Sequence, residues 1–162
     1  MKVSEIPYKR YTIEEAFASV RTKLQNAASS REALAARDEF LSMMTTYATA
    51  ASLSHCRFTL NTKDPFYQAE VAYYDEVGPL FGELNVQYSD LMLASPFRAE
   101  MEAQIGSRTF RMYEIAKKTF SPAIVEDLQK ENAVTTEYSK FMSEMLFTFD
   151  GEKMPLSVLR GK

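Results

Sequence analysis

Residues 61–98 read NTKDPFYQAEVAYYDEVGPLFGELNVQYSDLMLASPFR and carry the longest helical pattern in the chain. Asp64 followed by Pro65 predicts a helix start, because aspartate accepts hydrogen bonds from the first free amides and proline suits the first helical position. Apolar residues then recur every three or four positions, as on one buried helix face: Phe66, Ala69, Tyr73, Val77, Leu80, Leu84, Tyr88 and Leu91. Pro79 predicts a kink after Gly78 within one helix, and Ser95-Pro96 starts a new direction.

The segment before this helix is also predicted to be helical. Thr12 with Glu15 resembles a capping box for a first helix that ends near Ala28, and Ser29-Ser30 would cap a second helix that runs to Asn61. The second helix places one apolar row beside another: Leu41, Met44, Ala48, Ala51 and His55, flanked by Phe40, Met43 and Tyr47. The link of residues 61–63 is short enough to make the second and third helices an antiparallel hairpin.

Beyond Pro96 the predicted elements become shorter. They are a helix that ends near Ile105 with Gly106 after it, a helix from Ser107, a helix from Ser121-Pro122 that fades near Asn132, and a last helix capped by Thr135 or Thr136. Asp150-Gly151 then predicts a β-hairpin over residues 146–157. Few glycines and prolines interrupt the chain, which favours an all-α domain over residues 1–162. We expect an antiparallel bundle of about six helices with an extended leader over residues 1–11.

Charge and composition exclude several function classes. A net charge of -3 argues against nucleic-acid binding, which needs a basic surface. No window approaches the roughly 20 apolar residues of a membrane span. Cys56 is the single cysteine, so an internal disulfide is excluded, which is compatible with a reducing cytoplasm. We expect Cys56 to be a small core residue.

The residues offer little catalytic chemistry of their own. His55 is the only histidine, which excludes a zinc-binding HExxH helix and a di-iron site that needs Glu-x-x-His on two helices. His55 and Cys56 are adjacent, and adjacent helical side chains point about 100° apart, so they do not form a nucleophile and base. The sequence has no glycine-rich phosphate loop. No catalytic and no metal-binding residue is predicted.

The acidic residues of the third helix fall into two groups. Glu76, Glu83 and Asp90 repeat every seven positions and are predicted to form a solvent-facing row. Glu70 instead lies among apolar residues, where an unpaired carboxylate is costly, so a basic partner is implied. Counting outward from the short link predicts His55 as that partner, with Arg57 as the substitute. We favour a structural role for the pair, which would hold the two helices together, over a catalytic role.

Several stretches together resemble a known family. They are Tyr8-Lys9-Arg10, residues 61–67, Tyr74-Asp75-Glu76 with Pro79, residues 94–98, residues 118–122, residues 126–129, Glu131-Asn132, Glu137-Tyr138, and Asp150-Gly151-Glu152 with Leu156-Ser157. In this order they resemble the N-terminal region of oligoendopeptidase F, a zinc metallopeptidase related to thimet oligopeptidase. No single motif carries the resemblance, which extends over nearly the whole chain.

The resemblance implies the N-terminal wall and lid of a cytoplasmic, zinc-dependent peptidase that hydrolyses short peptides in a deep channel. The zinc-binding HExxH helix of the family would belong to a C-terminal catalytic half that this sequence does not contain, so no activity is expected from this chain alone. Tyr67 and Tyr74 would then either face the channel or pack as ordinary half-buried aromatics. The abrupt end after the hairpin suits a piece of a longer polypeptide.

A second reading stays open beside the first. The chain would then be a free-standing helical interaction module that has kept the wall without the active site. Its exposed apolar face would be covered by a second copy or by another protein partner.

Overall fold

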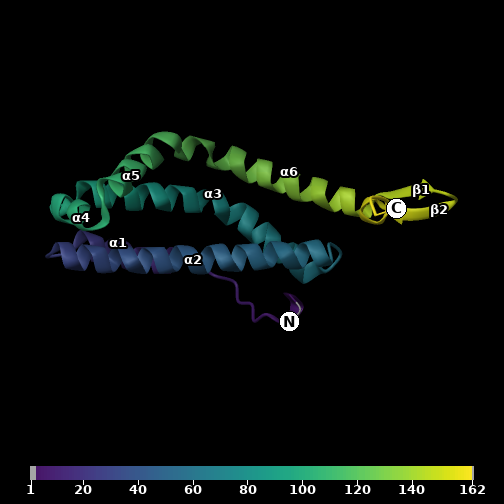
Figure 1. The fold of residues 1–162 in the computed structure, drawn as a ribbon, viewed down its shortest axis with the longest axis horizontal. Coiled ribbons are helices and arrows are strands. Elements are labelled where there is room, and N and C mark those ends of the chain that lie inside the picture. Colours follow the sequence, from purple (N-terminus) through teal and green to yellow (C-terminus); the bar gives the residue numbers. More distant parts are fainter. Residues whose placement is uncertain (1–2, 162) are drawn as a thin grey trace.

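Two long antiparallel helices form the frame of the fold. In the computed structural model, which describes residues 3–161, α2 (Ser30–Leu60) and α3 (Pro65–Ala94) lie side by side (Figure 1). The Oδ1 atom of Asp64 accepts hydrogen bonds from the backbone amides of Phe66 and Tyr67, at 2.9 and 3.3 Å. The predicted helical hairpin and its proline-initiated second arm are thereby confirmed.

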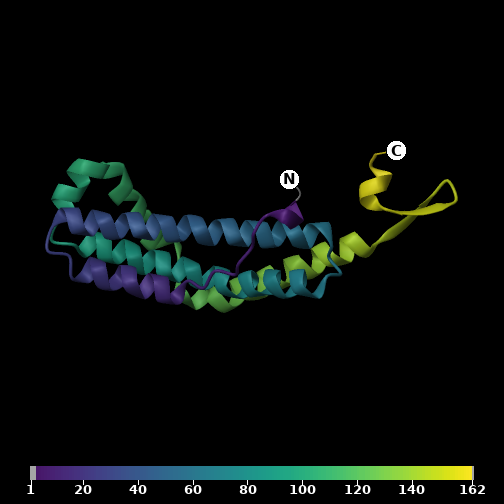
Figure 2. The same ribbon diagram turned by 90° about the horizontal axis from the view of Figure 1, so that it is seen from below.

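The remaining helices mostly pack on this pair, and the hairpin extends beyond it (Figure 1). The remaining elements are η1 (Val3–Glu5), α1 (Glu14–Gln25), α4 (Arg98–Ile105), α5 (Ser107–Thr119), η2 (Pro122–Ile124), α6 (Val125–Glu144), β1 (Leu146–Phe149), β2 (Glu152–Pro155) and α7 (Leu156–Leu159). α1 packs on α2 and α3, while α5 and α6 cover successive parts of α3 (Figures 1 and 2). The all-α class with one small C-terminal hairpin is confirmed, with seven α-helices in the described part of the chain.

Two predicted helix boundaries were wrong. Thr12 does not cap α1, which begins at Glu14. The N-cap residue is Ile13, whose side chain is buried in the core and makes no capping hydrogen bond. The two helices predicted on either side of Asn132 are a single helix, α6, because polar residues that suggested an ending contact α3 instead. The leader takes a 3-10 turn at η1, and residues 7–13 have no regular secondary structure.

The core is built on the aromatic row of α2. Phe40, Met43 and Tyr47 are buried. In the row predicted beside them, Leu41, Ala48 and His55 are exposed, whereas Met44 and Ala51 are half-buried against the core. Two apolar rows adjoin on this helix, and the one with the larger aromatic side chains fills the interior. The prediction that Cys56 is a core residue was also wrong, because its side chain is exposed on the outer side of α2.

α3 is buried along more than one face. Val77 and Tyr88 lie in the core as predicted, and the ring of Tyr88 stacks on Phe40 with 3.7 Å between ring centroids. Phe66 and Leu80, predicted on the same buried stripe, are exposed. Because α1, α2, α5 and α6 all contact α3, a single one-sided stripe does not describe this helix.

α3 continues through Pro79 as one helix, as predicted, and its ribbon changes direction along its length (Figure 1). Proline has no amide hydrogen, so the carbonyl oxygen of Asp75, four residues earlier, lacks its helical donor. The side-chain amide of Asn132 on α6 donates to that oxygen at 3.1 Å. α6 therefore supplies from outside the hydrogen bond that the kinked helix has lost.

The hairpin stands at the far end of the molecule (Figure 2). β1 pairs antiparallel with β2, with Leu146 opposite Pro155 and Phe149 opposite Glu152. The turn residues Asp150 and Gly151 both have positive φ, as Asp-Gly hairpin turns require. Leu156, predicted to continue the second strand, begins α7 instead. None of the helices in the described residues is long and apolar enough to cross a membrane.

Candidate functional site

Glu70 on α3 is the centre of the most connected polar cluster. Its side chain lies inside the protein, with only 5% of the residue exposed. The Arg10 guanidinium donates to both carboxylate oxygens, with Nη2 at 2.5 Å from Oε1 and Nε at 3.2 Å from Oε2. The Tyr8 hydroxyl donates to Oε2. A buried carboxylate is tolerated here because an arginine and a phenol both satisfy it.

The same region of α2 and α3 holds the leader through its backbone. Arg57 donates from Nη2 to the carbonyl oxygen of Ile6 at 2.5 Å. The amide of Tyr11 donates to the Tyr74 hydroxyl at 3.2 Å, and the Tyr73 hydroxyl donates to the carbonyl oxygen of Tyr11 at 3.2 Å. The leader is therefore fixed along the two long helices although it has almost no secondary structure.

The electrostatics of the cluster keep Glu70 ionised. Burial by itself would raise the pKa of Glu70, but the hydrogen bonds from Arg10 and Tyr8, with the charge of Arg10, lower the pKa below its ordinary value. Burial and the hydrogen bond to Glu70 raise the pKa of Tyr8 well above its ordinary value, so its phenol stays protonated. A carboxylate saturated by donors in this way is a poor general base.

A basic partner for Glu70 was predicted correctly, but the residue predicted for that role was wrong. Glu70 has a basic partner, which is Arg10 and not His55 or Arg57. Arg57 is nearly buried but bonds to Ile6, and His55 is exposed on the neighbouring side of α2. Register between two helices alone does not reveal that the leader lies between these groups and supplies the closer cation.

Asp75 is a second partly buried carboxylate of α3 whose pKa is shifted. Burial raises the pKa of Asp75, and this effect is opposed by the hydrogen bond from Thr136 and by the positive charge that His55 can carry. The Thr136 hydroxyl donates to Asp75 Oδ2 at 2.6 Å.

The other residues that the sequence suggested differ in how deeply they are buried. Tyr74 is in the interior and packs edge-on against Tyr47 with 5.6 Å between ring centroids, whereas Tyr67 is half-buried near the start of α3. In the predicted solvent-facing row, Glu76 is exposed, but Asp90 forms an ion pair with Lys117 of α5 at 2.7 Å. That row is thus partly used to join α3 to α5.

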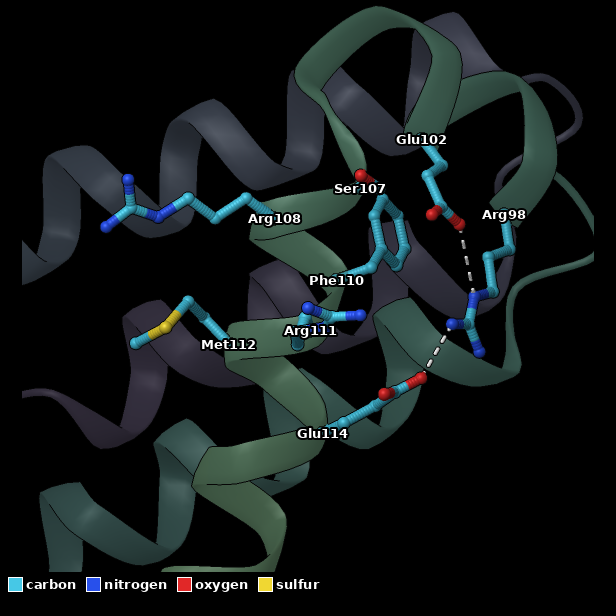
Figure 3. A pocket seen from close by; sticks show the side chains of 8 residues that line it. All are labelled: Arg98, Glu102, Ser107, Arg108, Phe110, Arg111, Met112 and Glu114. Atoms are coloured by element: carbon cyan, nitrogen blue, oxygen red, sulfur yellow. Dashed lines mark hydrogen bonds and ion pairs between the residues drawn. The ribbon is translucent and has the colours of Figure 1, made fainter.

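A hollow of about 550 Å³ lies at the turn between α4 and α5 (Figure 3). Arg98 lies there between two carboxylates, with Nη2 at 2.8 Å from Glu114 Oε1 and Nε at 3.8 Å from Glu102 Oε2 (Figure 3). The Arg108 side chain extends away from Arg98. Because Arg98 is already neutralised, this hollow is a surface ion-pair network that ties α4 to α5.

Within residues 3–161, no group of three or more His, Cys, Asp or Glu side chains is placed to hold a metal ion. The single histidine and the distribution of carboxylates therefore do not fit a zinc site.

What the Glu70 cluster can do chemically is fix the leader on the bundle. The sequence reasoning missed Tyr8 and Arg10 as its members; their pattern of a phenol and a guanidinium two positions apart in an irregular segment was the available signal.

A model of the peptidase M3 N-terminal domain family matches residues 3–120. The chain belongs to this family. The match covers the leader, the helical hairpin and the α4–α5 turn, so the Glu70 cluster lies wholly within it. A comparison with curated proteins gave no match.

Solved structures resemble the M3 N-terminal domain over nearly all of its length. A structure of Pz peptidase A with an inhibitor is 35% identical with a TM-score of 0.88, and one of a protein assigned as oligoendopeptidase F is 35% identical with a TM-score of 0.89; each comparison covers 99% of this chain. A Bacillus anthracis protein, also assigned as oligoendopeptidase F, is 31% identical over 97% of this chain with a TM-score of 0.86. The chain spans 29% of the length of each of these proteins.

Proposed function

We propose that this chain forms the N-terminal wall and lid of a zinc-dependent oligopeptidase that hydrolyses short peptides. The observation that carries the proposal is the agreement between the family match and the close structural similarity to oligoendopeptidase F over almost the whole chain. The zinc and the catalytic groups would be held by a C-terminal half outside this chain, which would be its main partner. The cytoplasm is the compartment we propose for such an enzyme.

The role of the domain would be physical enclosure. A wall of long helices limits which peptides can enter a channel, and sealing the channel excludes water from the reacting bond. The domain would contribute no group to bond cleavage, because its most connected carboxylate, Glu70, is neutralised by Arg10. Its residues would act by holding the wall in one shape.

A chimeric enzyme tests this proposal. This chain replaces the matching region of the Bacillus anthracis oligoendopeptidase F, and the chimera and the isolated chain are assayed on internally quenched peptides of increasing length. We expect cleavage of short peptides by the chimera, a loss of cleavage as the peptides lengthen, and no cleavage by the isolated chain. Zinc-dependent cleavage by the isolated chain, or a folded chimera that cleaves nothing, would overturn the proposal. The second outcome would favour a free-standing interaction module.

A further inference from the structure

α6 is a helix without a buried side chain. All 20 of its residues are described, and none is buried, whereas α2 and α3 each bury several. An isolated helix of this length is marginal in water and normally owes its stability to a packed apolar face. Its apolar packing is limited to half-buried side chains such as Val125 and Leu128, so polar contacts carry much of its attachment.

Three of the side chains with which α6 meets α3 are polar. Gln129 donates from Nε2 to the carbonyl oxygen of Glu76 at 2.7 Å, and Asn132 donates to the carbonyl oxygen of Asp75 at 3.1 Å. Thr136 donates to the carboxylate of Asp75. The spacing of three and four residues puts the three donors on one side of the helix. Because Pro79 has removed a helical donor from this part of α3, that polar side is tied to α3 by hydrogen bonds.

Three large apolar side chains lie on the opposite face of α6, in its C-terminal part. Val134, Tyr138 and Phe141 are spaced by four and three residues, and at about 100° per residue their row lies roughly 180° from the row of donors. Their exposed fractions are 64%, 62% and 60%. The C-terminal part of the helix thus differs from an ordinary surface helix, because its large apolar side chains face outward and the side chains that face α3 donate hydrogen bonds.

The apolar row has an acidic surround, and further exposed apolar side chains follow it in β1. Leu146 and Phe149 of β1 are also exposed. α6 carries five acidic residues against two lysines, a net charge of -3 (2 − 5), and Lys130 is paired with Glu126 at 2.8 Å. A second copy docked on the same face would bring two acidic surrounds together, which charge repulsion opposes. An occupant with apolar side chains and a basic surround is favoured instead.

We propose that the outward row of α6, Val134, Tyr138 and Phe141, is a docking surface for the catalytic half of the oligopeptidase. This inference rests on the proposed function, and it adds the location and chemistry of the contact. In each of the three similar structures this domain matches 29% of the chain. The larger, unmatched part of such a protein is the polypeptide that would cover the row. The contacting segment is expected to present aliphatic or aromatic side chains flanked by lysine or arginine.

Thiol labelling at the row tests the inference. Tyr138→Cys is introduced in a Cys56→Ser background, and its rate of reaction with a maleimide is compared between the isolated chain and the chimera with the Bacillus anthracis protein. Ser19→Cys, on the exposed side of α1, is the matched control. We expect labelling of Tyr138→Cys to be slower by about tenfold or more in the chimera, because the site would react only in transiently open molecules. The control should change much less.

The labelling rates test the docking surface, and peptide cleavage by the chimera tests the proposed function. Equal labelling of Tyr138→Cys in both proteins, or equal slowing at both positions, overturns the docking surface even if the chimera is active. A chimera that shows the slowing but cleaves no peptide contradicts the proposed function and leaves the docking surface supported, since labelling does not need activity. The isolated chain is also examined by sedimentation equilibrium; a dimer in which Tyr138→Cys is protected would make a second copy the occupant and overturn the proposal.

Discussion

The side-chain amide of Asn132 on α6 occupies the place of the helical donor that Pro79 denies to the carbonyl oxygen of Asp75. A proline within a long helix leaves one carbonyl unpaired, and a buried or half-buried carbonyl without a partner costs free energy. Here the repair comes from another helix, so the kink in α3 and the attachment of α6 depend on one another. This dependence makes the pair suitable for a double-mutant cycle.

Asn132→Ala should destabilise the protein by about 1 kcal/mol, the typical net value of one hydrogen bond. In a Pro79→Ala background the cost should be smaller, because the substituted alanine restores an amide that can bond to Asp75 within α3. Urea unfolding of the wild type, the two single variants and the double variant measures the difference. Thr135→Ala, an exposed change on the same helix, is the control. Equal costs of Asn132→Ala in both backgrounds would contradict the repair.

The Glu70 cluster predicts a pH dependence of stability. The folded pKa of Glu70 is lowered from its ordinary value of 4.5, so the stabilisation it provides is complete above about pH 4.5 and is lost as the pH falls through the folded pKa. Glu70→Gln should cost about 1–3 kcal/mol at neutral pH, since the charge-assisted bonds to Arg10 and Tyr8 are weakened. The gap in the free energy of unfolding between wild type and Glu70→Gln should narrow as the pH is lowered below 4.5.

The matched control for this prediction is Glu76→Gln on the same helix. The Glu76 side chain is exposed, and its change should alter the free energy of unfolding by less than about 0.5 kcal/mol. A gap between wild type and Glu70→Gln that stays constant from neutral to acidic pH would show that the ionised carboxylate does not provide the stabilisation.

The leader should be released locally when the cluster is broken. Lys9 and Arg10 are trypsin sites within the segment that Glu70, Arg57 and Tyr74 hold in place. Glu70→Gln should speed cleavage at these sites by roughly fivefold to a hundredfold, the range that corresponds to 1–3 kcal/mol of local stability. Mass spectrometry of timed digests under native conditions gives the rate at each site. Equal acceleration at sites in α2 or α6 would instead indicate global unfolding.

Much of the fold was predictable because local signals agree with the final structure. Asp64-Pro65 starts α3, Ser29 caps α2 with its hydroxyl accepting from the Glu32 amide at 3.3 Å, and Asp150-Gly151 forms the hairpin turn. Each of these signals acts over a few residues. The choice between two adjoining apolar rows on α2 was not predictable in this way, since both have helical spacing and only tertiary packing selects one.

The site was less predictable because its partners are distant in the sequence. Glu70 was recognised as a carboxylate that needs a cation, but Arg10 lies 60 residues away in a segment with no periodicity. Similarly, Asn132 suggested a helix end because asparagine disfavours helix interiors, and its value at this position comes from a proline in another helix. Polar residues that serve a neighbouring element carry no local signal of that role.

A close contact between α3 and Phe120 gives the last prediction. A Cβ atom added at Gly82 would lie 2.8 Å from Cε2 of the Phe120 ring, so the ring could not stay where it is. Gly82→Ala should therefore cost about 1–3 kcal/mol, the usual range for overpacking, although alanine by itself favours a helix. Phe120→Leu in the same protein should recover part of the loss by removing the ring atoms in the way.

Gly78 provides the comparison for Gly82. A Cβ atom there would have its nearest neighbours at 3.8 Å, an ordinary contact, so Gly78→Ala should cost less than Gly82→Ala even with Pro79 next to it. Thermal unfolding of the three single variants and of the Gly82→Ala, Phe120→Leu double variant measures the coupling. Phe120 lies between α5 and η2. If the effects of Gly82→Ala and Phe120→Leu on stability simply add in the double variant, the contact of Phe120 with α3 does not hold the link from α5 into α6.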